Sequence, residues 1–260
     1  MGRNSPIGIL DSGVGGLSVL PRLINLLPNE CFVYIGDNAR FPYGDKKPSW
    51  LRQTSLELGE FLVKKGVKAI VIACGTLSSH TVELTAREFR LPVFGVIEPT
   101  IRELNKHESK RTIVWATPAT IESGAYQDRL SKRGEQVKYI PSSLAASVEN
   151  GQLLNIPSSD GDVIVLGCTH YSWLNLNSPV VKIGSARELA YEVKARLGDE
   201  GLLAKEHQGE SSFYFTGDIQ KPQQKLDRLF MGRAVAKLIN LKEEVYVSHR
   251  GETSGSLYSW

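Results

Sequence analysis

Residues 66–76 read GVKAIVIACGT, an apolar run that ends abruptly in a cysteine, a glycine and a hydroxyl residue. Continuous hydrophobicity without alternation is typical of a strand buried on both faces, as in a parallel sheet covered by helices. Open α/β sheets bind their ligands at the carboxyl ends of such strands. The run therefore predicts a buried parallel strand with Cys74 at the edge of the sheet where a site is expected.

A second stretch repeats this pattern later in the chain. Residues 162–170 read DVIVLGCTH, another short apolar run followed by a cysteine and a hydroxyl residue. We interpret the protein as two halves that bring Cys74 and Cys168 to opposite sides of one cleft. The expected fold class is α/β, with two pseudo-symmetric three-layer domains that contain mainly parallel sheets, and an active site in the cleft between them.

Turn signals and a late apolar run set the expected domain boundaries. Glu98-Pro99 predicts a hinge between the halves, and residues 213–218 (FYFTGD) are expected to form a last strand that returns to the first half. The first α/β domain is predicted to comprise residues 1–98 and 210–245, and the second residues 99–209. Residues 246–260 are expected to form a loose tail. Helices are expected over residues 17–27, 50–65, 81–89, 121–132, 186–197 and 226–239.

Length and composition bound the class of protein. The chain has 260 residues, of which 41% are hydrophobic, so a globular protein with a sizeable core is expected. A net charge of +3 is too small to indicate a nucleic acid or an anionic membrane as partner. Three cysteines do not make a disulfide framework, and no apolar run approaches membrane-spanning length. We therefore expect a cytoplasmic protein.

Two loops near the N-terminus contain turn residues that suit ligand contacts. Residues 11–16 (DSGVGG) join a short strand to a helical pattern but lack the glycine spacing of a Rossmann loop and the lysine of a P-loop. Their amides suit a small anion such as a carboxylate, although the local pattern alone favours a tight turn with Asp11 as a helix cap. In the second loop, Tyr43 lies between proline and glycine, which would hold it rigidly and suits a ligand contact; the alternative is an ordinary turn with a half-exposed tyrosine.

The two cysteines define the expected chemistry. A single cysteine at a strand end is usually a packing residue. Two at equivalent places, each near a hydroxyl residue, favour stabilised thiolates instead. His170 is a candidate proton or charge partner for Cys168, and the alternative is an imidazole that only caps the strand end.

Two thiols that face one carbon from opposite sides suit inversion of a stereocentre. One thiolate removes the α-proton, and the other thiol returns a proton to the opposite face. A cysteine protease would leave the second cysteine unexplained, and neither cysteine forms a Cys-x-x-Cys motif for a redox pair or structural zinc. No metal or cofactor is expected, although the sequence alone leaves a pyridoxal Schiff base open.

Five motifs resemble those of glutamate racemases, in the aspartate/glutamate racemase superfamily; they lie at residues 6–17, 42–44, 95–99, 123–127 and 166–171. The resemblance runs from about residue 6 to residue 240. It implies two α/β domains, a cofactor-free two-base mechanism and a homodimer. It also implies an acid/base pair, Cys74 and Cys168, with helper roles for Asp11, Glu149 and His170. The residues that it implies for binding of the amino acid are Ser12, Pro42, Tyr43, Gly44, Gly75, Thr76 and Thr169.

The sequence departs from the family pattern around the expected substrate. Gly75 replaces an asparagine, Gly184 an aspartate and Ser172 a proline, and the spacer between Glu149 and Cys168 is shorter than usual. We expect Gly75 to leave a space about the size of the missing amide. The enzyme is then predicted to favour aspartate at least as much as glutamate, and Gly75→Asn to shift the preference toward glutamate.

Three functional hypotheses follow. The first is a racemase of glutamate, which would supply the D-isomer for cell-wall peptidoglycan, or of aspartate, in specialised metabolism. The second is a non-catalytic binding protein on the same fold with a protein partner, against which the retention of both cysteines argues. The third is another reaction of the superfamily, such as decarboxylation or racemisation of a hydantoin.

Overall fold

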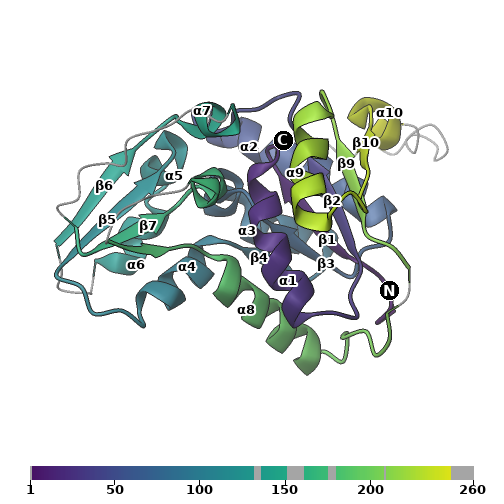
Figure 1. The fold of residues 1–260 in the computed structure, drawn as a ribbon, viewed down its shortest axis with the longest axis horizontal. Helices are drawn as coiled ribbons and strands as arrows, with labels where there is room; N and C mark the ends of the chain where they lie inside the picture. The colour runs from purple at the N-terminus through teal and green to yellow at the C-terminus, as the bar shows by residue number, and fades with distance from the viewer. Residues whose placement is uncertain (1, 132–135, 151–160, 175–179, 208, 247–260) are drawn as a thin grey trace.

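The computed structural model describes residues 2–131, 136–150, 161–174, 180–207 and 209–246, which form two sheets flanked by helices (Figure 1). The larger sheet has the strand order β10-β9-β2-β1-β3-β4, and the smaller one the order β6-β5-β7-β8. Every strand pair in the described residues is parallel. The predicted α/β class with parallel sheets is confirmed.

The strands of the two sheets come from separate parts of the chain. The larger sheet contains β1 (Ile7–Asp11), β2 (Phe32–Gly36), β3 (Ala69–Ile72), β4 (Val93–Gly95), β9 (Ser212–Phe215) and β10 (Ala236–Leu238). The smaller sheet contains β5 (Arg111–Ala116), β6 (Gln136–Pro141), β7 (Val163–Leu166) and β8 (Val181–Ile183). The last strands thus return to the first half, as the run at residues 213–218 predicted.

Helices connect the strands. The longer ones are α2 (Pro48–Lys64), α3 (Gly75–Phe89), α4 (Ile97–Leu104), α8 (Ala186–Asp199) and α9 (Gln220–Phe230). The shorter ones are α1 (Leu20–Leu26), α5 (Pro118–Glu122), α6 (Ala125–Leu130), α7 (Ala145–Glu149) and α10 (Leu241–Tyr246), with 3₁₀ turns η1 (Gly15–Val19) and η2 (Thr169–Trp173). Among the described residues, every helix is too short or too polar to span a lipid bilayer.

Both faces of the larger sheet are buried, which explains the continuous apolar runs. On one face, Ile7 and Ile9 of β1 pack with apolar residues of α1, α8 and α9. On the other, Leu10 packs with residues of α2 and with Leu77 of α3. Helix α8 follows the smaller sheet in the chain but contributes Leu189 to the core of the larger one, and it runs beneath both in Figure 1. The exact domain boundaries stay a prediction.

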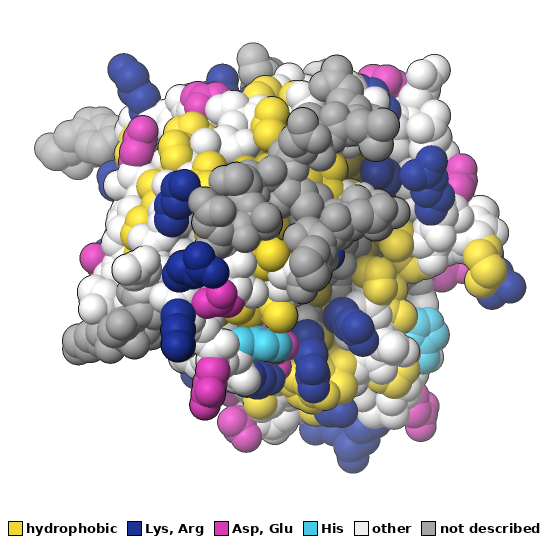
Figure 2. Space-filling view, turned by 60° about the vertical axis from the view of Figure 1, so that its left-hand side comes forward, with side chains coloured by type: hydrophobic (Ala, Val, Ile, Leu, Met, Phe, Trp, Pro, Cys, Tyr) yellow, Lys and Arg dark blue, Asp and Glu magenta, His cyan; other side chains and the backbone are white. Residues whose placement is uncertain are grey.

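The smaller sheet is covered in the same way. One of its faces packs against α4 and α6, through residues such as Leu104 and Tyr126. On the other, Trp115 of β5 stacks on Tyr171 of η2 with ring centroids 4.1 Å apart. On the outer surface shown in Figure 2, basic and acidic side chains are interspersed over much of the face.

Several predicted boundaries are wrong, and each error has a local cause. Glu98-Pro99 is no hinge but the start of α4, where proline is tolerated because its missing N–H has no intrahelical partner in the first turn. Helix α3 begins at Gly75 rather than residue 81. The helix expected over residues 121–132 is divided into α5 and α6 at Gly124, which has a φ of 75°.

The end of the chain also differs from the prediction. The helix expected over residues 226–239 begins and ends earlier, as α9, and residues 236–238 form β10 instead. The break falls at Met231 and Gly232, which both have positive φ. Pro21 lies in the first turn of α1, where proline is tolerated. The tail expected from residue 246 lies outside the described residues except for Tyr246, which ends α10.

Candidate active site

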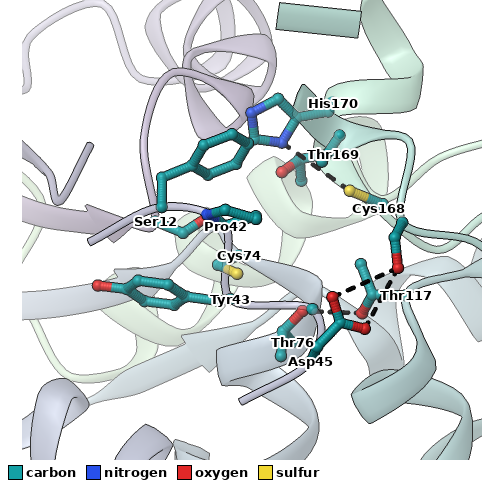
Figure 3. A pocket seen from close by; sticks show the side chains of 14 residues that line it. Ser12, Pro42, Tyr43, Asp45, Cys74, Thr76, Thr117, Cys168, Thr169 and His170 are labelled. Carbon is teal, nitrogen blue, oxygen red and sulfur yellow. Dashed lines mark hydrogen bonds between the residues drawn. The ribbon is translucent and has the colours of Figure 1, made fainter. Parts of the chain in front are cut away.

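A small cavity lies where the carboxyl ends of strands from both sheets meet (Figure 3). Its volume is about 20 Å³, enough for one water molecule. Most of the predicted site residues line it: Ser12, Pro42, Tyr43, Gly44, Cys74, Thr76, Cys168, Thr169 and His170. Three predicted residues do not line the cavity but adjoin or bond residues that do: Asp11, Glu149 and Gly75.

Cys74 connects β3 to α3 and lies at the strand end that the sequence predicted. It is a free, buried thiol. Burial, together with the negative charge of Asp11, raises the pKa of Cys74 to about 12, against the opposing effect of hydrogen bonds from the Leu77 amide and Ser12. Cys74 is therefore a protonated thiol near neutral pH.

Asp11 anchors the glycine-rich turn next to Cys74. Its Oδ2 accepts hydrogen bonds from the amides of Gly13 and Gly16, each at 3.0 Å, and from the Tyr34 hydroxyl at 3.3 Å. Its Oδ1 is buried and has no hydrogen-bond partner in the described part of the chain. Asp11 is not the N-cap of η1, which is Val14, so the expected capping role is replaced by bonds inside the turn.

The glycines of this turn allow close approach of side chains rather than of phosphate. A Cβ atom at Gly15 would lie 2.3 Å from Nδ1 of His170, and one at Gly16 would lie 2.8 Å from Cγ of Asp11. Both separations are shorter than any ordinary van der Waals contact. The turn therefore brings an aspartate of the first half and a histidine of the second close to one another.

Cys168 lies in the other half of the protein, where its thiol, His170 and Glu149 form a row of interacting polar groups. The His170 Nδ1 atom is 3.9 Å from the Cys168 Sγ atom, and its Nε2 atom is 3.2 Å from Oε2 of Glu149. Burial lowers the pKa of His170, but the hydrogen bonds to Cys168 and Glu149 outweigh it and raise the pKa to about 10. His170 is therefore an imidazolium near neutral pH, held between Glu149 and the sulfur atom.

Tyr43 is held rigidly, as its neighbours in the sequence suggested. Its hydroxyl donates a hydrogen bond to Oδ2 of Asp37, and Oδ1 of Asp37 accepts one from the Thr216 hydroxyl at 2.6 Å. Its ring meets Trp50 edge-on with centroids 4.9 Å apart. Burial and the charge of Asp37 raise the pKa of Tyr43 well above its ordinary value. The tyrosine thus presents its ring and backbone to the cavity, with its hydroxyl already engaged.

Hydrogen bonds across the cavity join the two halves. The Thr76 hydroxyl bonds that of Thr117 at 2.9 Å, and Ser143 donates to the Asp45 carboxylate at 3.2 Å (Figure 3). The Ala119 amide donates to the Gly44 carbonyl at 2.8 Å. These bonds hold the cleft closed.

Sequence reasoning missed five residues of the lining: Phe41, Asp45, Thr117, Ser143 and Ala145. Thr117 follows an apolar strand, β5, and so carries the same signal as Thr76. Asp45 and Ser143 lie in loops whose sequence gives no comparable signal.

The expectation of free space at Gly75 is wrong. A Cβ atom there would lie 2.3 Å from the carbonyl oxygen of Gly167 and 3.9 Å from Cα of Cys168. The backbones beside the two cysteines are therefore in direct contact. Gly184 differs, since a Cβ atom there would meet only Oγ of Ser172, at 3.7 Å. Gly184 and Ser172, two of the departures from the family pattern, are therefore neighbours in space.

Sequence comparisons relate the chain to known proteins. The sequence model of the family described as Asp/Glu/Hydantoin racemase matches residues 7–160. Glutamate racemase of Thermus thermophilus is 37% identical over 92% of this chain and 98% of its own. Glutamate racemase of Aquifex aeolicus is 38% identical over 93% of this chain and 99% of its own.

Solved structures give the same relationship. Glutamate racemase isoform RacE1 of Bacillus anthracis superposes with a TM-score of 0.81 at 33% identity, over 91% of this chain and 98% of its own. The Thermus thermophilus enzyme in complex with beta-chloro-D-alanine gives 0.79 at 35% identity, over 94% of this chain and 100% of its own. Aspartate racemase of Picrophilus torridus, at 15% identity and a TM-score of 0.54, shares the fold alone. This chain belongs to the Asp/Glu/Hydantoin racemase family, as its motifs predicted, and is an amino-acid racemase.

Proposed function

We propose that this racemase interconverts L- and D-glutamate by two-base proton transfer between Cys74 and Cys168. The observation that carries the proposal is that two free, buried thiols from different sheets line one cavity. Relatives named glutamate racemases match more than nine-tenths of the chain, which supports glutamate as the substrate.

In this proposal the reaction begins with Cys168 as the thiolate and Cys74 as the thiol. The imidazolium of His170 lies beside Cys168 and supports a thiolate there. Cys74, with its pKa raised to about 12, carries a proton. The resting enzyme is thus ready for the glutamate enantiomer whose α-hydrogen faces Cys168.

In the reaction, the Cys168 thiolate takes the α-proton, and the electron pair of the broken C–H bond moves into the α-carboxylate. The Cys74 thiol then gives its proton to the opposite face of the α-carbon, which inverts the configuration. Cys168 is left as a thiol and Cys74 as a thiolate, the state that accepts the other enantiomer. The enzyme returns to its resting state by proton exchange with water or by the reverse reaction.

Neutral donors bind the two carboxylates of the substrate in this proposal. No lysine or arginine lines the cavity in the part of the chain that the structure describes. The hydroxyls of Ser12, Thr76, Thr117 and Thr169 line it instead. Hydroxyls can both donate to a carboxylate and accept from an ammonium group, so they suit an amino acid.

Binding requires the cleft to open. A volume of about 20 Å³ holds one water molecule and not an amino acid. Opening breaks the hydrogen bonds between Thr76 and Thr117 and between Asp45 and Ser143, and these donors then become free for the substrate. The proposal further includes a homodimer in the cytoplasm that supplies D-glutamate for peptidoglycan.

Circular dichroism of L- and D-glutamate and of L- and D-aspartate, each incubated with the protein, tests the proposal. Glutamate is expected to racemise with the higher kcat/KM. Cys74→Ala and Cys168→Ala are each expected to lower the rate of racemisation by about 10²–10⁴-fold or more, because one general acid or base contributes a rate enhancement of about that size. Cys31→Ala is the matched control, since Cys31 is also a buried cysteine but does not line the cavity. Faster racemisation of aspartate would overturn the choice of substrate, and activity in either of the first two variants near that of Cys31→Ala would overturn the mechanism.

A further inference from the structure

A second pocket lies away from the two cysteines, between α1 and α8. Its volume is about 180 Å³, against about 20 Å³ for the cavity between the two cysteines. The residues that line it are Arg22, Asn25, Leu26, Arg187, Ala190 and Tyr191. None of them belongs to the cavity described above.

The spacing of these residues places them on the facing sides of two helices. Arg22, Asn25 and Leu26 are three and four residues apart on α1, so they share one face. Arg187 and Tyr191 are four residues apart on α8 and also share a face. The two helices pack against each other, so two guanidinium groups from distant parts of the chain reach one pocket.

The acidic residues of α8 nearest in sequence to Arg187 and Tyr191 are Glu188 and Glu192, and they do not neutralise this pair of arginines. Glu188 pairs with Lys106, and Glu192 pairs with Arg102 of α4, so both carboxylates are engaged away from the pocket. Neither Arg22 nor Arg187 forms an ion pair with any described residue. No acidic residue lines the pocket in the described part of the chain. The pocket therefore concentrates two unpaired positive charges.

The other lining groups complete a site for a small anion. Asn25 is exposed and can donate hydrogen bonds from its amide. Ala190 is buried and forms an apolar floor, and the ring of Tyr191, 49% exposed, stands at the edge. Such a combination suits an anionic head group attached to a small apolar part.

We propose that this pocket binds a phosphate group, free or in a small phosphate monoester. Guanidinium groups bind phosphate oxygens through paired, charge-assisted hydrogen bonds. A phosphate monoester carries a charge of about −1.5 to −2 at pH 7, which balances two arginines, whereas a single carboxylate balances one. Tyr191 and Leu26 contact the ester's organic part.

Isothermal titration calorimetry with inorganic phosphate and with phenyl phosphate, at matched ionic strength, tests the site. Phenyl phosphate is expected to bind one per chain. Arg22→Gln and Arg187→Gln are each expected to weaken both ligands by about tenfold or more, the usual loss for one charge-assisted hydrogen bond. Arg52→Gln is the control, because Arg52 is an exposed arginine of α2, which packs on the opposite face of the larger sheet.

The variant Tyr191→Ala separates the two sources of phosphate. It is expected to weaken phenyl phosphate and to leave inorganic phosphate unchanged if the site takes a monoester. If Tyr191→Ala binds both ligands as tightly as the wild-type protein does, the site is assigned to free phosphate. Absence of binding to the wild-type protein would overturn the proposal. It would also be overturned if Arg22→Gln and Arg187→Gln bound both ligands as tightly as the control Arg52→Gln.

Discussion

Substitution of Gly75 by alanine tests how closely the two halves of the protein must approach. The new Cβ atom would lie 2.3 Å from the carbonyl oxygen of Gly167, whereas ordinary contacts begin at 3.4 Å. The obstacle is backbone, so it cannot rotate away as a flexible side chain would. The strand ends that carry Cys74 and Cys168 must therefore move apart by about 1 Å.

Such a displacement acts directly on the proposed reaction. Both thiols must reach one α-carbon, and a misplacement of about 1 Å in an active site can lower the rate by about 10²-fold. We expect kcat/KM of Gly75→Ala for glutamate to fall by about two orders of magnitude, and that of Gly75→Asn to fall at least as far. The predicted shift of Gly75→Asn toward glutamate assumed a free space at this position, and that space does not exist.

The assay is the rate of glutamate racemisation by circular dichroism, with the melting temperature recorded to confirm that each variant folds. Gly184→Ala is the matched control, since its Cβ atom would meet only Oγ of Ser172 at an ordinary 3.7 Å. It is expected to keep wild-type activity. If Gly75→Ala stays within threefold of Gly184→Ala, the contact does not set the separation of the thiols and this reasoning is wrong.

Two further predictions concern His170, which lines the cavity, and Asp37, which holds Tyr43. The folded protein raises the pKa of His170 to about 10 from about 6.5, so this group stabilises the fold below about pH 6.5, and the contribution is lost as the pH rises to about 10. The melting temperature of wild type should therefore exceed that of His170→Gln most at low pH, and a gap that grows toward pH 10 would contradict the assignment. Asp37→Asn removes the charge that holds Tyr43, which is expected to raise KM for glutamate about tenfold with a smaller change in kcat; an unchanged KM would show that Asp37 does not position the tyrosine.

The sequence was most informative where a local pattern controls the structure. The apolar runs before Cys74 and Cys168 predicted two buried parallel strands, because a strand covered on both faces must be apolar throughout. The placement of polar residues after these strands predicted a shared cavity, since the carboxyl ends of parallel strands lie at one edge. His170 was likewise found from its position next to a thiol.

Features that depend on packing between the halves could not be predicted in this way. The contact of Gly75 with Gly167 joins segments more than 90 residues apart, and nothing in either local sequence specifies it. The bond between Asp45 and Ser143 is of the same kind. Pro99 was misinterpreted for a different reason, since a proline is compatible both with a turn and with the first turn of a helix, and only the apolar face of α4 decides between them.

The fate of the α-hydrogen in deuterated water tests the two-thiol mechanism most directly. Wild-type enzyme incubated with one enantiomer of glutamate is expected to form the other with deuterium at the α-carbon, as followed by NMR. Cys74→Ala is expected to exchange the α-hydrogen of only the enantiomer that faces Cys168, without inversion, and Cys168→Ala that of the opposite enantiomer alone. Product that retains the original hydrogen, or inversion that continues in either single variant, would contradict the assignment of Cys74 and Cys168 as the two bases.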